Sequence, residues 1–355
     1  MITLSVALGE RSYPLFMAEN LLVDADLFAK ILGGRPFVIV SSQNLKDYAS
    51  ALAHTLKAPA EACLLLPDGE SFKNMHTLNQ ILEHLTNLHF PRQGVLIALG
   101  GGVIGDTVGF AAAIYQRGIA FIQVPTSLLA MVDSSIGGKT AVNVGQAKNN
   151  VGAFHQPLAV IMDIELLKTL PEREYHAGLA EVLKHALIQD PIFFDWLMQQ
   201  RHKIAVRDTA TVTEMIQRSC EIKAQIVEQD EKEQGLRMLL NFGHTFGHAI
   251  EAYSQYQDFK HGEAVALGML CALKWQGQTE IAAQVKVLYQ AWHLPTELPV
   301  HYDPQRLFEL MLHDKKKSAT AIRLILLKEI GAGVIVEVSD FTHLQQFWNV
   351  AHRSD

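Results

Sequence analysis

Cysteine is scarce in this chain of 355 residues, which holds only Cys63, Cys220 and Cys271. The three lie far apart, none belongs to a Cys-x-x-Cys pair, and their number is odd. Secreted domains that depend on disulfides use even, closely spaced sets, so the pattern argues against that class. It predicts buried thiols in a reducing compartment, and we expect a cytoplasmic protein.

Two further absences narrow the function. Positive charge is not in excess, because 30 Lys and Arg stand against 37 Asp and Glu. A nucleic-acid binder needs a basic face, so we expect no nucleic-acid partner. No apolar run approaches the roughly 20 residues of a membrane span, and the first ten residues lack the basic and apolar segments of a signal peptide. We therefore expect no membrane partner.

Short apolar strands alternate with amphipathic helices in the first 160 residues. Strands are predicted at 1–10, 37–41, 62–66, 95–99 and 119–124, and helices at 45–56 and 75–88. From residue 172 onward helical spacing dominates, and only 322–327 and 333–338 look extended. We predict an N-terminal NAD-binding α/β domain with a Rossmann-like parallel sheet over residues 1–160. A mostly helical metal- and substrate-binding domain, classed as all-α, is predicted over 161–355.

A glycine-rich turn follows the predicted strand 95–99. Residues 100–105 have the G-x-G-x-x-G spacing that lets a pyrophosphate approach a helix N-terminus. The usual fingerprint also has an acid about 20 residues later, but residues 111–132 contain no Asp or Glu. A ribose partner would have to come from elsewhere, and Asp68 and Glu70 follow an earlier strand. On spacing alone, binding of another phosphate and a purely structural turn remain open.

A group of histidines indicates a metal. His244 and His248 are four residues apart and share a helix face, and His261 opens a second helical pattern. Glu181 is a candidate for the carboxylate in a catalytic site with three protein ligands and one open position. Spacing alone would make both His244 and His248 ligands. The alternatives are hydrogen-bonded histidines and, for Glu181, an ordinary ion pair with Lys184 one turn later.

Cations gather in segments that could hold an anionic substrate. Lys139 and Lys148 stand in loops rich in Gly, Ser and Asn, and Lys223, Arg237 and the run 315–317 follow. A charge run is usually a solvated surface, but loops after strands are where α/β proteins place their sites. Several cations near one metal suit a substrate with both a carboxylate and a phosphate.

Seven segments together resemble the 3-dehydroquinate synthase family of sugar-phosphate cyclases, which acts in the shikimate pathway. They occur in the family's order over nearly the whole chain: 67–73 (PDGESFK), 100–106 (GGGVIGD), 123–127 (QVPTS), 133–143 (DSSIGGKTAVN), 181–184 (EVLK), 240–251 (LNFGHTFGHAIE) and 261–263 (HGE). Two departures occur. Ser127 stands where the family often has a second threonine, which keeps a hydroxyl, and Met131 stands where glutamine is common, for which we have no physical explanation.

The resemblance implies roles for individual residues. Zn²⁺ or Co²⁺ would be held by Glu181, His244 and His261, and His248 would contact substrate in proton transfer instead of binding the metal. NAD would be held by Asp68, Gly69, Glu70, Lys73, Gly101, Gly102, Val103, Ile104, Gly105, Asp106, Thr126, Ser127, Lys139, Lys148, Leu166, Lys168 and Thr169. The substrate, 3-deoxy-D-arabino-heptulosonate 7-phosphate, would be contacted by Asp133, Lys139, Asn149, Lys184, Lys223, Arg237, Asn241, His248 and one of Lys315 and Lys316. Arg117 resembles an arginine that reaches the phosphate from a neighbouring subunit, which implies a homodimer.

The implied reaction is that of a lyase that eliminates phosphate. NAD⁺ transiently oxidises the C5 hydroxyl, phosphate leaves, the hydride returns, and an intramolecular aldol step closes the ring of 3-dehydroquinate. The alternatives are another sugar-phosphate cyclase, a metal-dependent polyol dehydrogenase and an inactive NAD-binding scaffold. Segment 133–143 and Arg237 favour the substrate that carries a carboxylate.

Overall fold

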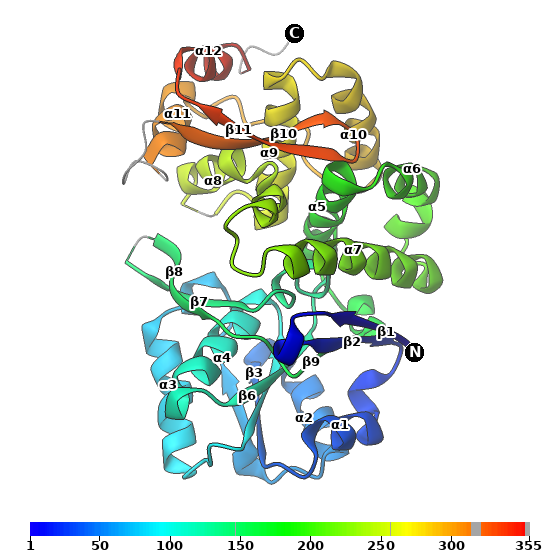
Figure 1. Ribbon diagram of the computed structural model, residues 1–355, viewed down its shortest axis with the longest axis vertical. Coiled ribbons are helices and arrows are strands. Elements are labelled where there is room, and N and C mark those ends of the chain that lie inside the picture. The colour runs from blue at the N-terminus through cyan, green and yellow to red at the C-terminus, as the bar shows by residue number, and fades with distance from the viewer. Residues whose placement is uncertain (146, 256, 314–320, 352–355) are drawn as a thin grey trace. The chain divides into compact units, whose positions relative to one another are not determined.

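Residues 1–145, 147–255, 257–313 and 321–351 are described by a computed structural model (Figure 1). They divide into two compact units. The first holds Met1–Leu170 together with Lys223–Lys232, and the second holds Pro171–Ile222 and the chain from Glu233 onward. These units are defined by compactness alone, so the functional domain boundary predicted at residue 160 stays a prediction. Lys315 and Lys316 lie outside the described residues.

A seven-stranded sheet forms the centre of the first unit, in the order β1-β2-β9-β6-β5-β3-β4. Only β1 and β2 pair in antiparallel fashion, and every other neighbouring pair is parallel. The strands are β1 (Ile2–Val6), β2 (Tyr13–Ala18), β3 (Phe37–Ser42), β4 (Cys63–Leu66), β5 (Val95–Gly100), β6 (Ala120–Pro125) and β9 (Ala159–Asp163). The predicted α/β class with a mostly parallel sheet is confirmed.

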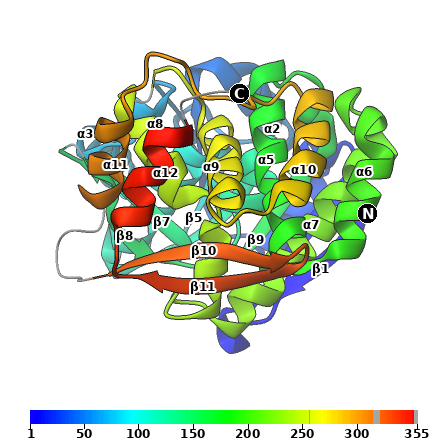
Figure 2. The same cartoon turned by 90° about the horizontal axis from the view of Figure 1, so that it is seen from above.

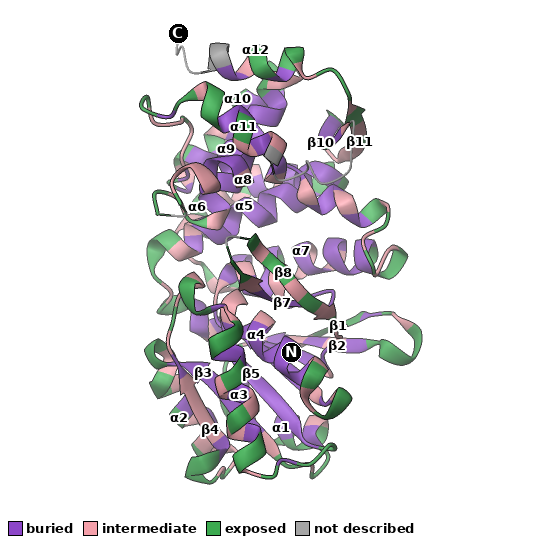
Figure 3. Ribbon diagram, turned by 90° about the vertical axis from the view of Figure 1, so that its left-hand side faces the viewer, coloured by how far each residue is buried: buried purple, intermediate pink, exposed green. Residues whose placement is uncertain are grey.

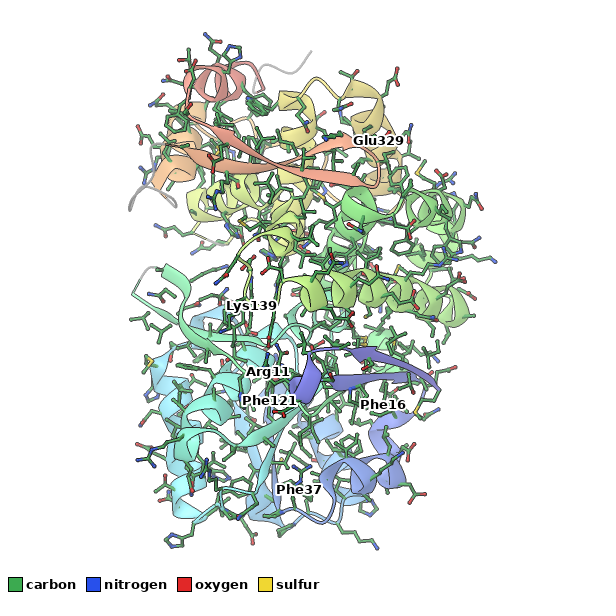
Figure 4. All side chains as sticks on the ribbon, in the orientation of Figure 1. Arg11, Phe16, Phe37, Phe121, Lys139 and Glu329 are labelled. Atoms are coloured by element: carbon green, nitrogen blue, oxygen red, sulfur yellow. The ribbon has the colours of Figure 1, made fainter. Side chains whose placement is uncertain are left out.

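Helices cover this sheet and explain why its central strands are continuously apolar. They are α1 (Ala25–Leu32), α2 (Lys46–Thr55), α3 (Met75–Asn87) and α4 (Gly102–Ile114). Every residue of β5 is buried, as expected for a strand with both faces covered (Figure 3). Val108 on α4 and Phe121 on β6 belong to one apolar cluster of this unit, and Figure 4 labels Phe121. The core therefore fixes the strand ends from which the candidate site is built.

A hairpin of β7 (Lys139–Val144) and β8 (Ala147–Phe154) also belongs to the first unit. Most of β8 is exposed or partly exposed, and Figure 3 shows it largely in green and pink. The two paired strands approach each other closely at Gly152. A Cβ on this residue would lie 2.0 Å from the carbonyl oxygen of Thr140. The glycine at this position is thus required by backbone contact.

The second unit is mostly helical. It contains α5 (Glu172–Gln189), α6 (Pro191–Ala205), the first part of α7 (Thr209–Gln229), α8 (His244–Tyr253), α9 (His261–Trp275), α10 (Thr279–Ala291), α11 (Pro304–His313) and α12 (Thr342–Ala351). A hairpin of β10 (Ile322–Glu329) and β11 (Ala332–Val338) runs along one side of the helices (Figure 2). The extended patterns predicted at 322–327 and 333–338 correspond to this hairpin. The predicted helical class therefore holds for this unit with one β-hairpin added to it. Among the described helices, none combines the length and apolar character that a bilayer crossing requires.

Candidate metal centre and dinucleotide site

Loops that follow parallel strands carry most of the residues predicted to bind a dinucleotide. The carboxyl ends of parallel strands lie at one edge of the sheet, so the loops after β4, β5, β6 and β9 share that edge. The direction of winding reverses between β3 and β5, because β4 lies beyond β3 and β6 beyond β5. Open α/β sheets bind ligands at such a reversal. The N–H of Thr126 donates to Gly100 O at 3.1 Å and ties two of these strand ends together.

Lys73 connects three of the segments at this edge. Its Nζ lies 2.5 Å from Asp106 Oδ2 on α4, and it also donates to Asn149 Oδ1 on β8. The N–H of Asn149 donates to Asn143 Oδ1 at 2.8 Å, and Asn143 Nδ2 donates to Glu70 Oε1 at 2.8 Å. Burial raises the pKa of Asp106, although Lys73 acts in the opposite direction. This network holds the loop after β4, helix α4 and the β7–β8 hairpin in one arrangement.

The glycine turn after β5 presents the N-terminus of α4. Gly101 precedes the helix, and Gly69 lies on the neighbouring loop with a φ of 108°. A Cβ on Gly105 would lie 2.6 Å from Oε1 of the buried Gln123 on β6. Glycine here permits the close helix–strand packing that the third glycine of a dinucleotide fingerprint provides. The N–H groups over 102–104 precede the first hydrogen bond of the helix, which the N–H of Gly105 donates to Gly101 O at 3.0 Å, and they suit a pyrophosphate.

Two residues of this edge were missed by the sequence analysis. Asn44 Nδ2 donates to Asp68 Oδ2 at 2.7 Å, and Tyr48 Oη lies 2.6 Å from Thr169 Oγ1. Both follow β3, the strand at which the winding reverses. The available signal was the polar run after Ser42, at the end of a strand that was predicted. Asn44 and Tyr48 therefore join the candidate dinucleotide residues.

The first unit also contains a buried acid–base pair among the predicted substrate residues. Lys223 Nζ donates to Asp133 Oδ1 and to the carbonyl oxygen of the same residue. Their side chains are 5% and 23% exposed, so the charges are largely removed from water. Lys139 opens β7 and is exposed (Figure 4). The positions of the first unit predicted to take an anion thus include one buried and one exposed lysine.

Four other predicted residues lie in different settings. Arg117 is exposed and has a φ of 65°, in the left-handed region that non-glycine residues rarely adopt. Lys148 lies on β8, and Leu166 is buried in the segment after β9. Lys168 Nζ lies 2.6 Å from Glu165 Oε1 at the surface. The side chain of Lys168 is therefore engaged within its own turn.

The metal candidates come together in the second unit. Glu181 on α5, His244 on α8 and His261 on α9 each offer a ligand atom, all within 4.8 Å of one another. Glu181 Oε1 lies 3.8 Å from His244 Nε2 and 3.9 Å from His261 Nε2. Donors around one tetrahedral zinc lie about 3.4 Å apart, given metal–ligand bonds of about 2.0–2.2 Å. Small shifts of these side chains would complete such a site.

The carboxylate of Glu181 uses its two oxygens differently. Oε2 accepts from Lys184 Nζ one turn later on α5, and both side chains are almost wholly buried. Oε1 is buried and makes no hydrogen bond within the described residues. Burying a carboxylate oxygen without a partner is costly, so the feature calls for a ligand that faces the two histidines. A divalent metal fits this donor set.

Glycines allow the three ligand-bearing helices to approach one another. A Cβ on Gly262, next to His261, would lie 1.9 Å from the carbonyl oxygen of Ala177 on α5. A Cβ on Gly268 would lie 2.1 Å from the carbonyl oxygen of Gly243, which precedes α8. Helix α9 is thus held against both of its neighbours by backbone contact, and this contact sets the spacing of the metal donors.

His248 lies beside this group without completing it. Its ring centroid is 5.5 Å from that of His244 and 6.3 Å from that of His261. The donor group contains His261 and not His248, which differs from the interpretation based on spacing alone. Asn241 Nδ2 donates to Glu233 Oε1 at 2.9 Å, and Arg237 is buried on the same short helical segment. Arg237 and Asn241 therefore lie in the segment that leads directly into His244 at the start of α8.

The chain is similar to known proteins along nearly its whole length. A family model described as 3-dehydroquinate synthase N-terminal matches residues 63–177, and one described as 3-dehydroquinate synthase C-terminal matches residues 178–317. A curated 3-dehydroquinate synthase from Hydrogenovibrio crunogenus is 47% identical over 341 residues, which cover 94% of this chain and 95% of that protein.

Solved structures of two related enzymes have a similar fold. A 2-deoxy-scyllo-inosose synthase in complex with carbaglucose-6-phosphate, NAD⁺ and Co²⁺ has a TM-score of 0.87 at 25% identity, covering 98% of this chain and 99% of that one. A 2-epi-5-epi-valiolone synthase from Streptomyces hygroscopicus subsp. jinggangensis, with NAD⁺ and Zn²⁺ bound, has a TM-score of 0.85 at 28% identity and covers 97% of each chain. Both relatives bind a dinucleotide and a divalent metal.

Proposed function

The chain belongs to the 3-dehydroquinate synthase family and has the activity of that lyase of the shikimate pathway, and we propose that it performs the reaction with NAD and a divalent metal. The substrate we propose is 3-deoxy-D-arabino-heptulosonate 7-phosphate. It would be converted to 3-dehydroquinate and phosphate with no net change in NAD. We also propose that the active form is a cytoplasmic homodimer, and that residues 1–160 and 161–355 are its functional domains.

The observation that carries the metal proposal is the buried oxygen of Glu181 that faces His244 and His261. These three residues would hold Zn²⁺ or Co²⁺, the ions found in the two related structures. Bound metal supplies a Lewis acid for an alcohol oxygen, and bound NAD⁺ supplies a hydride acceptor. Lys184 orients the carboxylate of Glu181, since it occupies the other oxygen. Three protein ligands leave a coordination position for the substrate.

The dinucleotide would lie at the carboxyl edge of the parallel sheet. We propose that Glu70, Lys73 and Asp106 position it, together with the N-terminus of α4. The support is the hydrogen-bonded network that joins these residues and the glycine that allows α4 to pack closely. The other proposed contacts are Asp68, Gly69, Gly101, Gly102, Val103, Ile104, Gly105, Thr126, Ser127, Lys139, Lys148, Leu166, Lys168 and Thr169, with Asn44 and Tyr48 added.

Each unit would supply groups that recognise the substrate. In the first unit these are Asp133, Lys139, Asn149 and Lys223, and in the second Lys184, Arg237, Asn241 and His248. Lysine and arginine hold carboxylate and phosphate groups by charge-assisted hydrogen bonds. His248 is proposed to move a proton, because its ring lies beside the metal donors without belonging to them. Arg117 is proposed to reach the phosphate of the neighbouring subunit.

The first experiment measures phosphate release from 3-deoxy-D-arabino-heptulosonate 7-phosphate by purified protein with catalytic NAD⁺. We expect release of phosphate without accumulation of NADH, and loss of the activity when a chelator removes the metal. Activity unaffected by complete metal removal would contradict the metal proposal. Turnover of sedoheptulose 7-phosphate in place of this substrate would contradict the substrate proposal. Size-exclusion chromatography with light scattering tests the dimer.

A further inference from the structure

The two histidines of the metal group have different partners on their far ring nitrogens. Nδ1 of His244 lies 3.3 Å from the carbonyl oxygen of Phe242. Nδ1 of His261 lies 3.4 Å from Oε1 of Glu251. In both rings Nε2 is therefore the nitrogen that faces Glu181. One histidine has a neutral backbone acceptor, and the other has a carboxylate.

Glu251 is a buried acid for which the reaction itself has no evident use. The residue is 2% exposed and lies on α8, seven residues after His244 and so on nearly the same helix face. Removing a carboxylate from water costs several kcal/mol unless it finds a cation or strong donors. His261 offers such a donor through Nδ1–H, provided that Nε2 keeps a lone pair for a metal.

We propose that Glu251 is a positioning residue of the metal centre, which fixes the tautomer and ring orientation of His261 and increases its donor strength toward a divalent metal. This inference rests on the proposed function, because it needs the metal to bind at Glu181, His244 and His261. A carboxylate behind a metal-bound imidazole holds the ring and makes its other nitrogen a stronger donor. The carbonyl oxygen behind His244 carries no full charge and provides a weaker form of the same support.

Charge balance supports this role. A divalent metal with Glu181 and Lys184 leaves a formal charge of +2 in a largely buried cluster, because the carboxylate and the ammonium cancel. Glu251 reduces this charge to +1 from behind His261, without occupying a coordination position. The acid thereby strengthens metal binding and still leaves one position open to substrate. Glu181 cannot lower the charge of the cluster further, since its second oxygen is held by Lys184 and its charge is balanced there.

The test compares Glu251→Gln with wild type and with Tyr175→Phe. Tyr175 Oη donates to the carbonyl oxygen of Ile204 at 2.8 Å in the same unit, so this control removes a buried hydrogen bond of a residue outside the candidate donor groups. Zn²⁺ affinity is measured by competition with a chromophoric chelator, and the Co²⁺ forms are compared by visible absorption. Thermal unfolding of the metal-free proteins reports on structure alone.

We expect Glu251→Gln to weaken Zn²⁺ binding about 10- to 100-fold and to change the Co²⁺ spectrum. Its metal-free form should unfold at or above the wild-type temperature, because the change removes a buried charge. Tyr175→Phe should bind Zn²⁺ within about twofold of wild type, although it unfolds at a lower temperature because a buried backbone carbonyl loses a hydrogen-bond donor. Glu251→Asp, which keeps the charge, should lie between wild type and the glutamine variant.

Unchanged Zn²⁺ affinity and an unchanged Co²⁺ spectrum in Glu251→Gln would overturn the inference, as would a loss of metal-free stability with no loss of affinity. If Glu251→Gln does not fold, equal affinities of Glu251→Asp and wild type overturn it instead. Failure of the wild type to bind Zn²⁺ would overturn both this inference and the metal proposal. A wild type that binds Zn²⁺ with Glu251 dependence, yet releases no phosphate, would contradict the proposed function alone.

Discussion

The candidate dinucleotide site of the first unit draws on the loops after β4, β5, β6 and β9, whereas the candidate metal centre of the second unit draws on three helices, α5, α8 and α9. The loop site consists of many polar contacts, of which the Lys73 network is the densest. The helical site consists of three side chains whose backbones are held together by glycine contacts. One site therefore depends on local hydrogen bonds, and the other depends on how closely helices pack.

This difference decides how each site should fail. A loop site loses contacts one at a time, since each polar group contributes separately and neighbouring contacts remain. A helical donor set fails as a whole, because a shift of one helix moves a ligand out of bonding distance. We expect mutations in the first unit to weaken NAD binding gradually and mutations in the second to abolish metal binding abruptly.

The largest effect is expected from His261→Ala. The change removes one of the three proposed metal donors, and we expect phosphate release to fall about 1000-fold, since a catalytic Lewis acid contributes several kcal/mol of transition-state stabilisation. NAD⁺ affinity, measured by calorimetry, should remain near the wild-type value because its proposed contacts lie in the other unit. Retention of bound metal together with normal turnover would show that His261 is not a ligand.

The next largest effect is expected from Lys73→Met. Asp106 would lose its cation while largely buried, and the free energy of unfolding should fall by about 3 kcal/mol. Urea denaturation measures this loss, and the double variant with Asp106→Asn should recover much of it. A double variant no more stable than the single one would mean that the ion pair is not the reason for the loss.

An intermediate effect is expected from Gly262→Ala. The added methyl group meets the carbonyl oxygen of Ala177 at 1.9 Å and must push α9 away from α5. We expect a loss of about 1–3 kcal/mol in unfolding free energy, and a loss of Zn²⁺ affinity greater than such a stability change would suggest. Normal Zn²⁺ affinity in a destabilised variant would show that donor geometry does not depend on how closely α9 packs against α5.

Smaller effects are expected at two helix caps, one in each unit. The Asn74 side chain accepts from the N–H of Thr77 at the start of α3, and Asp190 accepts from the N–H of Phe193 at the start of α6. Replacing either with alanine should lower the free energy of unfolding by about 1 kcal/mol. Asn74→Ala, next to Lys73, should also weaken NAD⁺ binding, whereas Asp190→Ala should leave metal affinity unchanged. If Asn74→Ala bound NAD⁺ as tightly as wild type does, the expected local sensitivity of the loop site would be contradicted.

The smallest expected effect is a change with pH at Asp106. Burial raises the pKa of this carboxyl in the folded state above its ordinary value. The folded state therefore holds the proton more tightly, and this group favours folding increasingly as pH falls through the raised pKa toward the unfolded value near 4. The stability of Asp106→Asn relative to wild type should accordingly increase as pH rises from 4 to 7. A relative stability that decreases over that range would show that Lys73 outweighs burial.

Most strands with continuous apolar runs were predicted, but β9 has the same pattern and was missed. The alternating strand predicted over 1–10 corresponds to β1. The predicted elements at 37–41, 62–66, 95–99 and 119–124 correspond to β3, β4, β5 and β6. Burial on both faces selects an unbroken apolar run in β3, β5 and β6, whereas β4 is a partly buried edge strand. Strand β2 was missed because it contains Pro14, which weakens a strand pattern. The β7–β8 hairpin was read as loops, since its glycine and asparagine content conceals a ladder that is mostly solvent-exposed.

The candidate sites show a similar limit. Spacing places His244 and His248 on one helix face. His261 lies close to His244 because glycine contacts hold α9 against α5 and α8, and no local sequence pattern reveals these contacts. His261 entered the ligand set through the family resemblance. Asn44 and Tyr48 went unnoticed because their importance follows from the order of strands in the sheet, and a sequence shows the order of strands along the chain only.

Helix α7 belongs to both compact units, and this has a consequence for how the protein can be divided. The chain passes between the units at 170–171, at 222–223 and again at 232–233, the last two around one end of this helix. A fragment ending at Leu170 would lack Lys223 and so remove the ion pair that this lysine makes with the partly buried Asp133. Neither unit can therefore be produced intact as a single continuous fragment, and gene fusions or circular permutations that separate them at one point would leave both incomplete.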